Sequence, residues 1–119
     1  MIQDANDYYW IATDRGVSRF DGKHIENFST GDGMCHNTVF TIFKDYKDRI
    51  WFQGHSGCIS YFENGKVHSY AYNDTILKYL NGKFVNSIYV DSSDNVYLNG
   101  IRHSIVVNNK GKARSQVKT

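Results

Sequence analysis

Hydrophobic residues along this chain fall in short runs that are separated by polar turns rich in Asp, Asn and Gly. In the middle of the chain, residues 39–43 and 50–52 are apolar at nearly every position, whereas residues 59–62 and 67–70 alternate more openly with polar side chains. A strand that is covered on both faces loses this alternation, and a strand at a solvated rim keeps it. The pattern therefore predicts two inner and two outer strands in succession, with Asn64-Gly65 as the hairpin turn before the last one.

This four-strand unit is one copy of an internal repeat. An earlier copy precedes it at an offset of 41 residues, and the matched pairs are Asp4 with Asp45, Trp10 with Trp51, Gly16 with Gly57, and Phe20 with Tyr61. A third, degraded copy follows at an offset of 46, with Asp91 for Asp45, Tyr97 for Trp51 and Gly100 for Gly54.

A period in the low forties made of short strands is the signature of propeller blades, which cannot bury their own apolar faces and must stack on one another. We therefore predict an all-β fold, a β-propeller fragment of about three four-stranded antiparallel blades. The blades are expected at approximately residues 1–30, 37–72 and 83–119, the third of them degenerate. The first is truncated, because only Ile2 and Gln3 remain of its inner strand.

The other strands follow from the same alignment. They are expected at residues 9–12, 17–20 and 24–28 in the first copy, and at residues 85–90, 96–99, 104–107 and 113–117 in the third. Residues 75–80 could form one or two helical turns behind Asp74 as the N-cap.

The repeated residues are predicted to have scaffold roles. An aspartate at a strand end followed by a short turn, as at Asp4, Asp45 and Asp91, can accept hydrogen bonds from the N–H groups of that turn. Trp10 and Trp51 are expected to fill the space between blades, with Tyr97 at the corresponding place in the third copy. Gly16 and Gly57 occupy a tight turn in which a positive φ is plausible. Stacking of the tryptophans on carbohydrate is the alternative, and their burial would contradict it.

Composition supports an all-β protein and argues against nucleic acid as a partner. Phe, Tyr and Trp make up 15% of the residues, there are 10 glycines and no proline, and the net charge is only +2. Lys110, Lys112, Arg114 and Lys118 gather at the C-terminus, where a solvated tail is the expected explanation. No apolar run approaches the roughly 20 residues that span a bilayer. Because repeat sequence follows Met1 directly, with no signal peptide, the chain is expected to be cytosolic or to have lost its N-terminal part.

No cofactor or metal is predicted. Cys35 and Cys58 do not form a C-x-x-C motif, so both are expected to remain thiols, with a disulfide between them as the alternative. Residues 91–95 resemble the start of a calcium loop but lack its later Gly and Glu. The five histidines show no metal-binding spacing, and no catalytic residue is evident.

Ligands usually meet a propeller at the loops between blades and at the turns between second and third strands, which open on one face. The candidate surface is therefore Arg15, Asp32, His36, Asn37, His55, Tyr72, Asp74, Lys78 and Arg102.

The first two copies resemble the two-component regulator propeller repeat. That family has an aspartate, a short turn, Trp with a hydrophobic neighbour, a Gly, an aromatic-Asp-Gly end and an Asp-Gly-hydrophobe connector. The matching residues here are Asp4, Trp10-Ile11, Thr13, Gly16-Val17, Arg19-Phe20-Asp21-Gly22, Asp32-Gly33-Met34, Asn37, Val39, Asp45 and Trp51-Phe52. In the third copy Tyr97 and His103 replace the expected Trp and Gly.

The resemblance implies the periplasmic sensor propeller of a hybrid two-component histidine kinase, which senses an extracellular ligand, often a glycan. It implies no catalytic residue within a blade, and the kinase motifs of such parents are absent from these 119 residues. We therefore expect a sensory fragment that binds ligand or scaffolds signal transmission, completed by other blades of the parent or by a homo-oligomer. A purely structural or protein-interaction propeller is the main alternative, and a propeller lyase or glycosidase is a more distant one.

Overall fold

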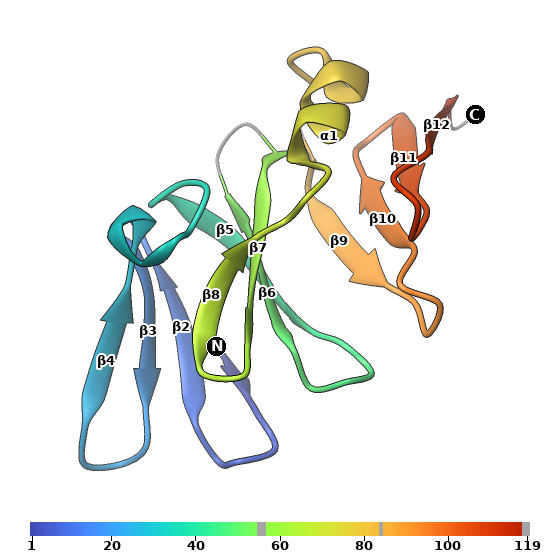
Figure 1. Ribbon diagram of the computed structural model, residues 1–119. Coiled ribbons are helices and arrows are strands. Elements are labelled where there is room, and N and C mark those ends of the chain that lie inside the picture. Colours follow the sequence, from blue (N-terminus) through green and yellow to red (C-terminus); the bar gives the residue numbers. More distant parts are fainter. Residues whose placement is uncertain (55–56, 84, 118–119) are drawn as a thin grey trace.

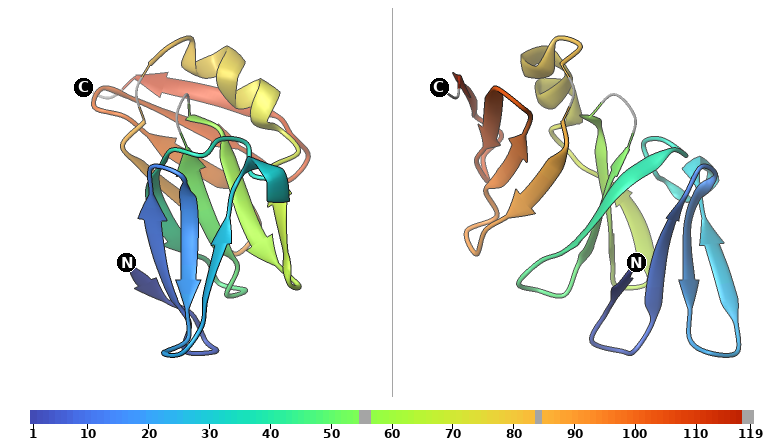
Figure 2. Two further views of the ribbon diagram at one scale, coloured as in Figure 1. Left: turned by 90° about the vertical axis from the view of Figure 1, so that its left-hand side faces the viewer. Right: turned by 180° about the vertical axis from the view of Figure 1, so that it is seen from behind.

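Three four-stranded antiparallel sheets stand side by side like the blades of a fan in the computed structural model (Figures 1 and 2), which describes residues 1–54, 57–83 and 85–117. Blade 1 contains β1 (Ile2–Gln3), β2 (Tyr9–Thr13), β3 (Gly16–Phe20) and β4 (Ile25–Phe28). Blade 2 contains β5 (Val39–Lys44), β6 (Ile50–Gly54), β7 (Ile59–Glu63) and β8 (Lys66–Ser69). Blade 3 contains β9 (Ser87–Val90), β10 (Val96–Asn99), β11 (His103–Val107) and β12 (Ala113–Val117). The predicted all-β blades are confirmed.

The inner strand of blade 1 contains only Ile2 and Gln3, as predicted: Ile2 pairs with Trp10 and Gln3 with Tyr9, and the rest of β2 has no described partner on that side. One detail of the predicted blades needs correction. The alignment of Phe20 with Tyr61 is wrong by one residue. Phe20 pairs with Tyr9, and the residue that pairs with the equivalent Ile50 is Phe62. The segment between the paired residues Gln53 and Ile59 is therefore one residue longer than the segment between the equivalent pair Ala12 and Val17, and the match of Gly16 with Gly57 hides this difference.

The repeated aspartate closes the first turn of every blade, as predicted. In blade 2, Asp45 Oδ1 accepts hydrogen bonds from the backbone N–H groups of Lys47 and Arg49, both at 2.9 Å. Its other oxygen, Oδ2, accepts the indole N–H of Trp51 at 2.7 Å. Asp4 does the same for Trp10, and Asp91 accepts the Tyr97 hydroxyl in blade 3.

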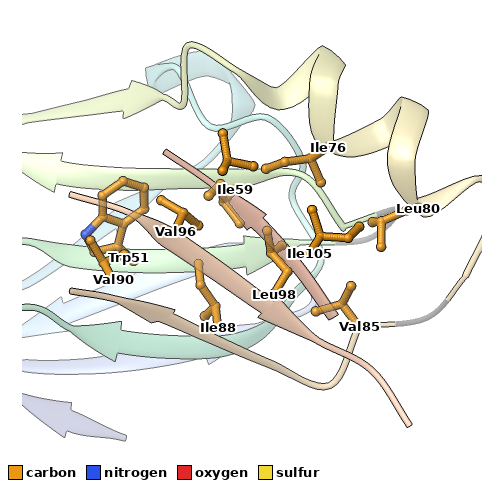
Figure 3. Close-up of a cluster of buried hydrophobic side chains, with 11 residues drawn as sticks. Trp51, Ile59, Ile76, Leu80, Val85, Ile88, Val90, Val96, Leu98 and Ile105 are labelled. Atoms are coloured by element: carbon orange, nitrogen blue, oxygen red, sulfur yellow. The ribbon is translucent and has the colours of Figure 1, made fainter. Parts of the chain in front are cut away.

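The two tryptophans lie between blades. Trp10 is completely buried between blades 1 and 2, where its ring contacts Phe28, Phe52 and Phe62. Trp51 lies between blades 2 and 3 (Figure 3), in a cluster with Val90, Val96 and other aliphatic side chains of blade 3. Because both rings are buried, the carbohydrate-stacking alternative is wrong.

A short helix, α1 (Asn73–Leu80), connects blades 2 and 3 and covers the upper end of their shared core, into which it places Ile76 and Leu80 (Figure 3). The helix was expected, but its N-cap was not. Tyr72 precedes the first turn and makes no side-chain cap. The side-chain amide of Asn73 instead exchanges two hydrogen bonds of 2.9 Å with the backbone of Ile59, which starts the helix one residue before Asp74. This is the only α-helix in the described part of the chain, and it is too short to cross a membrane.

Gly16 and Gly57 have positive φ values of 119° and 81°, as predicted. A Cβ at Gly16 would clash with the carbonyl oxygen of Phe28, and one at Gly57 would clash with the side chain of Leu80. The glycines therefore permit both the turn and the close approach of the next element.

Cys35 and Cys58 form a disulfide, with Cα atoms 6.2 Å apart, so the prediction of two thiols is wrong. The bond joins the β4–β5 connector to the start of β7. The same connector begins with a 3₁₀ turn, η1 (Thr30–Asp32). The Cys35 N–H also donates a hydrogen bond to the Ser60 hydroxyl at 2.8 Å. This hydrogen bond and the disulfide together hold the connector on blade 2.

Replacing Trp51 by alanine should lower the free energy of unfolding by roughly 3–5 kcal/mol, because the change leaves a cavity between blades 2 and 3. Urea unfolding followed by circular dichroism measures the loss. Ile101→Ala, at a position that is 78% exposed, is the control and should change little. An unchanged denaturation midpoint for Trp51→Ala would show that the ring does not support the blade stack.

Reduction of the Cys35–Cys58 bond should cost about 2–4 kcal/mol, since the cross-link spans 23 residues and restricts the unfolded chain. Urea unfolding with and without a phosphine reductant measures this difference. The reductant should have no effect on a variant with serine at both positions. Alkylation of the denatured, unreduced protein at either cysteine would contradict the disulfide.

Candidate functional site

The predicted ligand surface lies at one end of the fan. The β2–β3 and β10–β11 turns, η1 and α1 all occur at this end, and the aspartate turns occur at the other (Figures 1 and 2). Arg15, Asp74, Lys78 and Arg102 are exposed there on separate loops or on α1. His55 lies outside the described residues.

Three of the predicted residues hold their own connector in shape. The Asp32 carboxylate accepts the Ser29 N–H at 2.9 Å in a capping box, and Asn37 Oδ1 accepts the Thr30 N–H at 2.8 Å. His36 Nδ1 accepts the Thr38 N–H at 3.1 Å. Their polar groups are thus engaged in local structure, and the end of the fan shows no convergence of the predicted residues on one place.

Tyr72 is the exception, because it lines a pocket between blades 2 and 3. The pocket has a volume of about 170 Å³. Its lining combines aromatic rings with an ion pair and small aliphatic residues: Arg49, Trp51, Tyr61, Tyr70, Ala71, Tyr72, Val90, Asp94, Val96 and Asn109. We call this the inter-blade pocket.

The aromatic wall of the inter-blade pocket is built by β6, β7 and the segment after β8. Trp51 packs against Tyr61 with ring centroids 4.6 Å apart and against the edge of Tyr70 at 5.8 Å. Tyr72 meets Tyr70 edge-on at 5.5 Å. In the described part of the chain, the hydroxyls of Tyr61, Tyr70 and Tyr72 have no hydrogen-bond partner, so they are available to a ligand.

Charged groups from two blades form the rim of the pocket. Arg49 Nε donates to Asp45 Oδ2 and Arg49 Nη2 donates to Asp94 Oδ1, both at 2.6 Å. The Tyr46 hydroxyl also donates to Asp94 Oδ1, at 2.7 Å. These hydrogen bonds link the aspartate turn of blade 2 to the aspartate turn of blade 3. Arg49 and Asp94 form one end of the pocket.

The ionisation of these groups follows from their contacts. Burial opposes the charge of Asp94, but the hydrogen bonds from Tyr46 and Arg49 outweigh it and hold the pKa of Asp94 below its usual value. For Arg49, burial is likewise outweighed by the two carboxylates, which raise its pKa. Burial, followed by the nearby Tyr72 and Asp94, raises the pKa of Tyr70, so its hydroxyl remains a neutral donor and acceptor.

The pocket occurs where the third blade departs from the repeat. Between blades 1 and 2 the ring of Phe62 packs on Trp10 at 4.9 Å, and the pocket at that interface is lined mostly by charged and polar side chains of the two blades. By strand register, Val107 occupies the place of Phe62 in blade 3. Valine is smaller than phenylalanine, so blade 3 contributes no aromatic ring to the buried cluster around Trp51.

Sequence reasoning missed the inter-blade pocket apart from Tyr72. The sequence of the third copy could have pointed to the pocket, because this copy keeps the aspartate turn but has lost aromatic residues that would pack against blade 2. The arrangement can bind a small molecule through ring faces, hydroxyls and a carboxylate. It offers no nucleophile paired with a base. The described residues also contain no group of three or more His, Cys, Asp or Glu side chains that could hold a metal ion.

Asp94→Asn should reduce stability at pH 7 and have progressively less effect as the pH falls below about 4. The reason is that a carboxylate with a lowered pKa stabilises the folded state above its unfolded pKa, and this contribution is lost as it protonates. Urea unfolding of both proteins from pH 7 to pH 3 tests this, with the exposed Asp14→Asn as control. An equal difference in stability at all pH values would contradict it.

Comparison with known proteins supports the fold. No family model matches the sequence, and no curated protein matches it either. The chain is similar to the extracellular domain of BT3049 from B. thetaiotaomicron, described as a hybrid two-component system, with a TM-score of 0.64 and 19% identity. It is similar to the extracellular domain of BT4673 from the same organism, with a TM-score of 0.57 and 14% identity. The matches cover 99% of this chain but only 16% and 24% of those chains, so this chain resembles part of a larger sensor domain.

Proposed function

We propose that this chain is part of an extracytoplasmic sensor module of a two-component signalling protein, and that it binds a small hydroxyl-rich molecule, such as a glycan unit, in the inter-blade pocket. The observation that carries the proposal is the fold: the whole chain matches extracellular domains of proteins described as two-component systems. Its role in such a module is recognition, and catalysis is left to other parts of the parent protein.

The disulfide supports the extracytoplasmic location. Disulfides persist in oxidising compartments such as the periplasm and are rare in the cytosol, where thiols are kept reduced. The Cys35–Cys58 bond restrains the connector that leads into blade 2, so it has a structural use in the folded protein.

The chemistry of the inter-blade pocket supports a neutral, hydroxyl-rich ligand. Its volume is below the ~300–1,000 Å³ of pockets for drug-sized ligands, so it would take one ring. The tyrosine rings of the pocket can pack against the C–H groups of such a ring, and the hydroxyls of Tyr70 and Tyr72 can pair with its hydroxyls, while the buried Trp51 only supports the tyrosines. Asp94 is already neutralised by Arg49 and Tyr46, so the pocket has no strong preference for a charged ligand.

Two other functions compete with this proposal. A structural or protein-interaction propeller would hold neighbouring domains and leave the pocket empty. A lyase or glycosidase would need convergent acids, whereas the acids beside this pocket are engaged by Arg49. The pocket between the blades therefore favours binding over both.

Calorimetric titration of the purified chain with a panel of neutral mono- and oligosaccharides tests the proposal. At least one sugar should bind, and Tyr70→Ala should weaken its affinity tenfold or more, because it removes both a ring face and a hydroxyl from the pocket. Tyr79→Ala is the matched control, since Tyr79 is exposed on α1 and does not line the pocket. Absence of binding across the panel would favour the structural propeller. Binding that Tyr70→Ala leaves unchanged would place the site elsewhere.

A further inference from the structure

The turn between β11 and β12 is longer than the outer turns of the other two blades. Residues 108–112 form it, whereas residues 21–24 connect β3 to β4 in blade 1, and Asn64 and Gly65 alone connect β7 to β8 in blade 2. The length of this turn matters because Asn109 is one of the residues that line the inter-blade pocket.

The β11–β12 turn has the hydrogen bonds of an aspartate turn. Asn108 Oδ1 accepts the backbone N–H groups of Lys110 at 2.9 Å and Lys112 at 3.0 Å. The repeated aspartate makes the same pair of bonds in the first turn of each blade. The Gly111 N–H also donates to the Asn108 carbonyl at 3.0 Å. These bonds hold the backbone of the turn without a contribution from the Asn109 side chain.

Gly111 allows this turn to lie directly against the aromatic wall of the inter-blade pocket. Its φ is 85°, and a Cβ at this position would lie 2.4 Å from an atom of the Tyr72 ring. A residue with a side chain would therefore displace the ring or the turn. The contact places the β11–β12 turn of blade 3 beside a tyrosine of the pocket.

Asn109 is left with one unpaired hydrogen-bond acceptor. Its Nδ2 donates to the backbone carbonyl of Ser93 at 3.0 Å. Because a carbonyl oxygen only accepts hydrogen bonds, the nitrogen of the Asn109 amide must be the atom that faces Ser93. Oδ1 has no hydrogen-bond partner within the described residues. Asn109 is exposed, so this oxygen is at the mouth of the pocket and accessible to a ligand.

The carboxylate of Asp94 supplies a second acceptor close to the first. Ser93, which holds the Asn109 amide, directly precedes Asp94 in the chain. Asp94 Oδ1 already accepts two hydrogen bonds. Its Oδ2 lies 3.9 Å from Lys47 Nζ, which is too long for a hydrogen bond. Blade 3 thus provides two acceptors, whereas the tyrosine rings of the pocket come from blade 2 and the segment after β8.

We propose that the inter-blade pocket selects a neutral ring with two adjacent hydroxyl groups, one donating to Asn109 Oδ1 and the other to Asp94 Oδ2, and that Asn109 is a specificity-determining residue. This inference rests on the proposed function, since it concerns the ligand of the same pocket. Two neighbouring acceptors match two donors on neighbouring carbon atoms. A ring with one hydroxyl, or with hydroxyls on opposite carbons, leaves one acceptor without a partner in the complex.

NMR titration of the isotope-labelled 119-residue chain with small ring compounds tests this selection. The probes are cyclohexanol, cis-1,2-cyclohexanediol and 1,4-cyclohexanediol. The backbone amides of Ala71 and Val96, which line the pocket, report binding. The 1,2-diol should bind about fivefold more tightly than either of the other compounds, because it makes one more hydrogen bond.

Asn109→Ala should make the three affinities about equal, because the 1,2-diol then meets a single acceptor, as the other compounds do. Lys110→Ala is the matched control. Lys110 is exposed in the same turn and does not line the pocket, so this variant should keep the preference for the 1,2-diol. The amide spectrum of each variant confirms that it is folded.

Equal affinities of the parent chain for the three compounds would overturn the proposal and leave a pocket that binds neutral rings without this selection. A preference for the 1,2-diol that survives Asn109→Ala would also overturn it. If none of the three compounds shifts the amides of Ala71 and Val96, the binding of a neutral ring in the inter-blade pocket is contradicted as well.

Discussion

The blade stack depends on one hydrogen bond, from the buried indole of Trp51 to the carboxylate of Asp45. A large aromatic ring is needed to fill the space between two sheets, but the indole brings an N–H that must find a partner when it is buried. Asp45 provides that partner while its other oxygen closes the turn between β5 and β6. A single side chain thus fixes both the turn and the orientation of the ring. Arg49 compensates the charge of the buried carboxylate, so the ring can be buried without an isolated ion beside it.

The repetition of this unit explains why so much of the fold could be predicted from the sequence. The aspartate, the ring six residues later and the apolar inner strands are local features, and the burial of Trp10 and Trp51 follows from any arrangement in which such units stack. The error in the alignment of Phe20 with Tyr61 has the opposite origin. An extra loop residue leaves the glycine match intact, and only the pairing of β6 with β7 shows that Phe62 is the true equivalent.

The features that sequence reasoning missed depend on contacts between distant segments. Cys35 and Cys58 meet because the connector after blade 1 folds back onto blade 2, and nothing in their spacing states that path. The predicted ligand residues were chosen from loop position alone, and Asp32 and Asn37 instead satisfy backbone groups of their own connector. The start of α1 also depends on a distant segment. The side-chain amide of Asn73 is hydrogen-bonded to the backbone of Ile59 in β7, so the helix begins at Asn73 and Asp74 does not act as the N-cap.

The inter-blade pocket shows how a repeat can acquire a site by losing part of its pattern. The aromatic pair of Trp10 and Phe28 recurs as Trp51 and Tyr70, so blade 2 presents the same kind of wall as blade 1 but with an added hydroxyl. The blade that faces this wall has changed more, because Val107 and Ala113 stand where blade 2 has Phe62 and Val67. An aromatic wall that is no longer covered by a matching ring exposes its edges and hydroxyls to the space between the blades. The aspartate turns still hold the two blades together at one end through Asp94, which keeps the space from collapsing. Loss of aromatic residues in the third copy and retention of its turn therefore give this interface a pocket walled by tyrosine rings, whereas the pocket between blades 1 and 2 is lined mostly by charged and polar side chains.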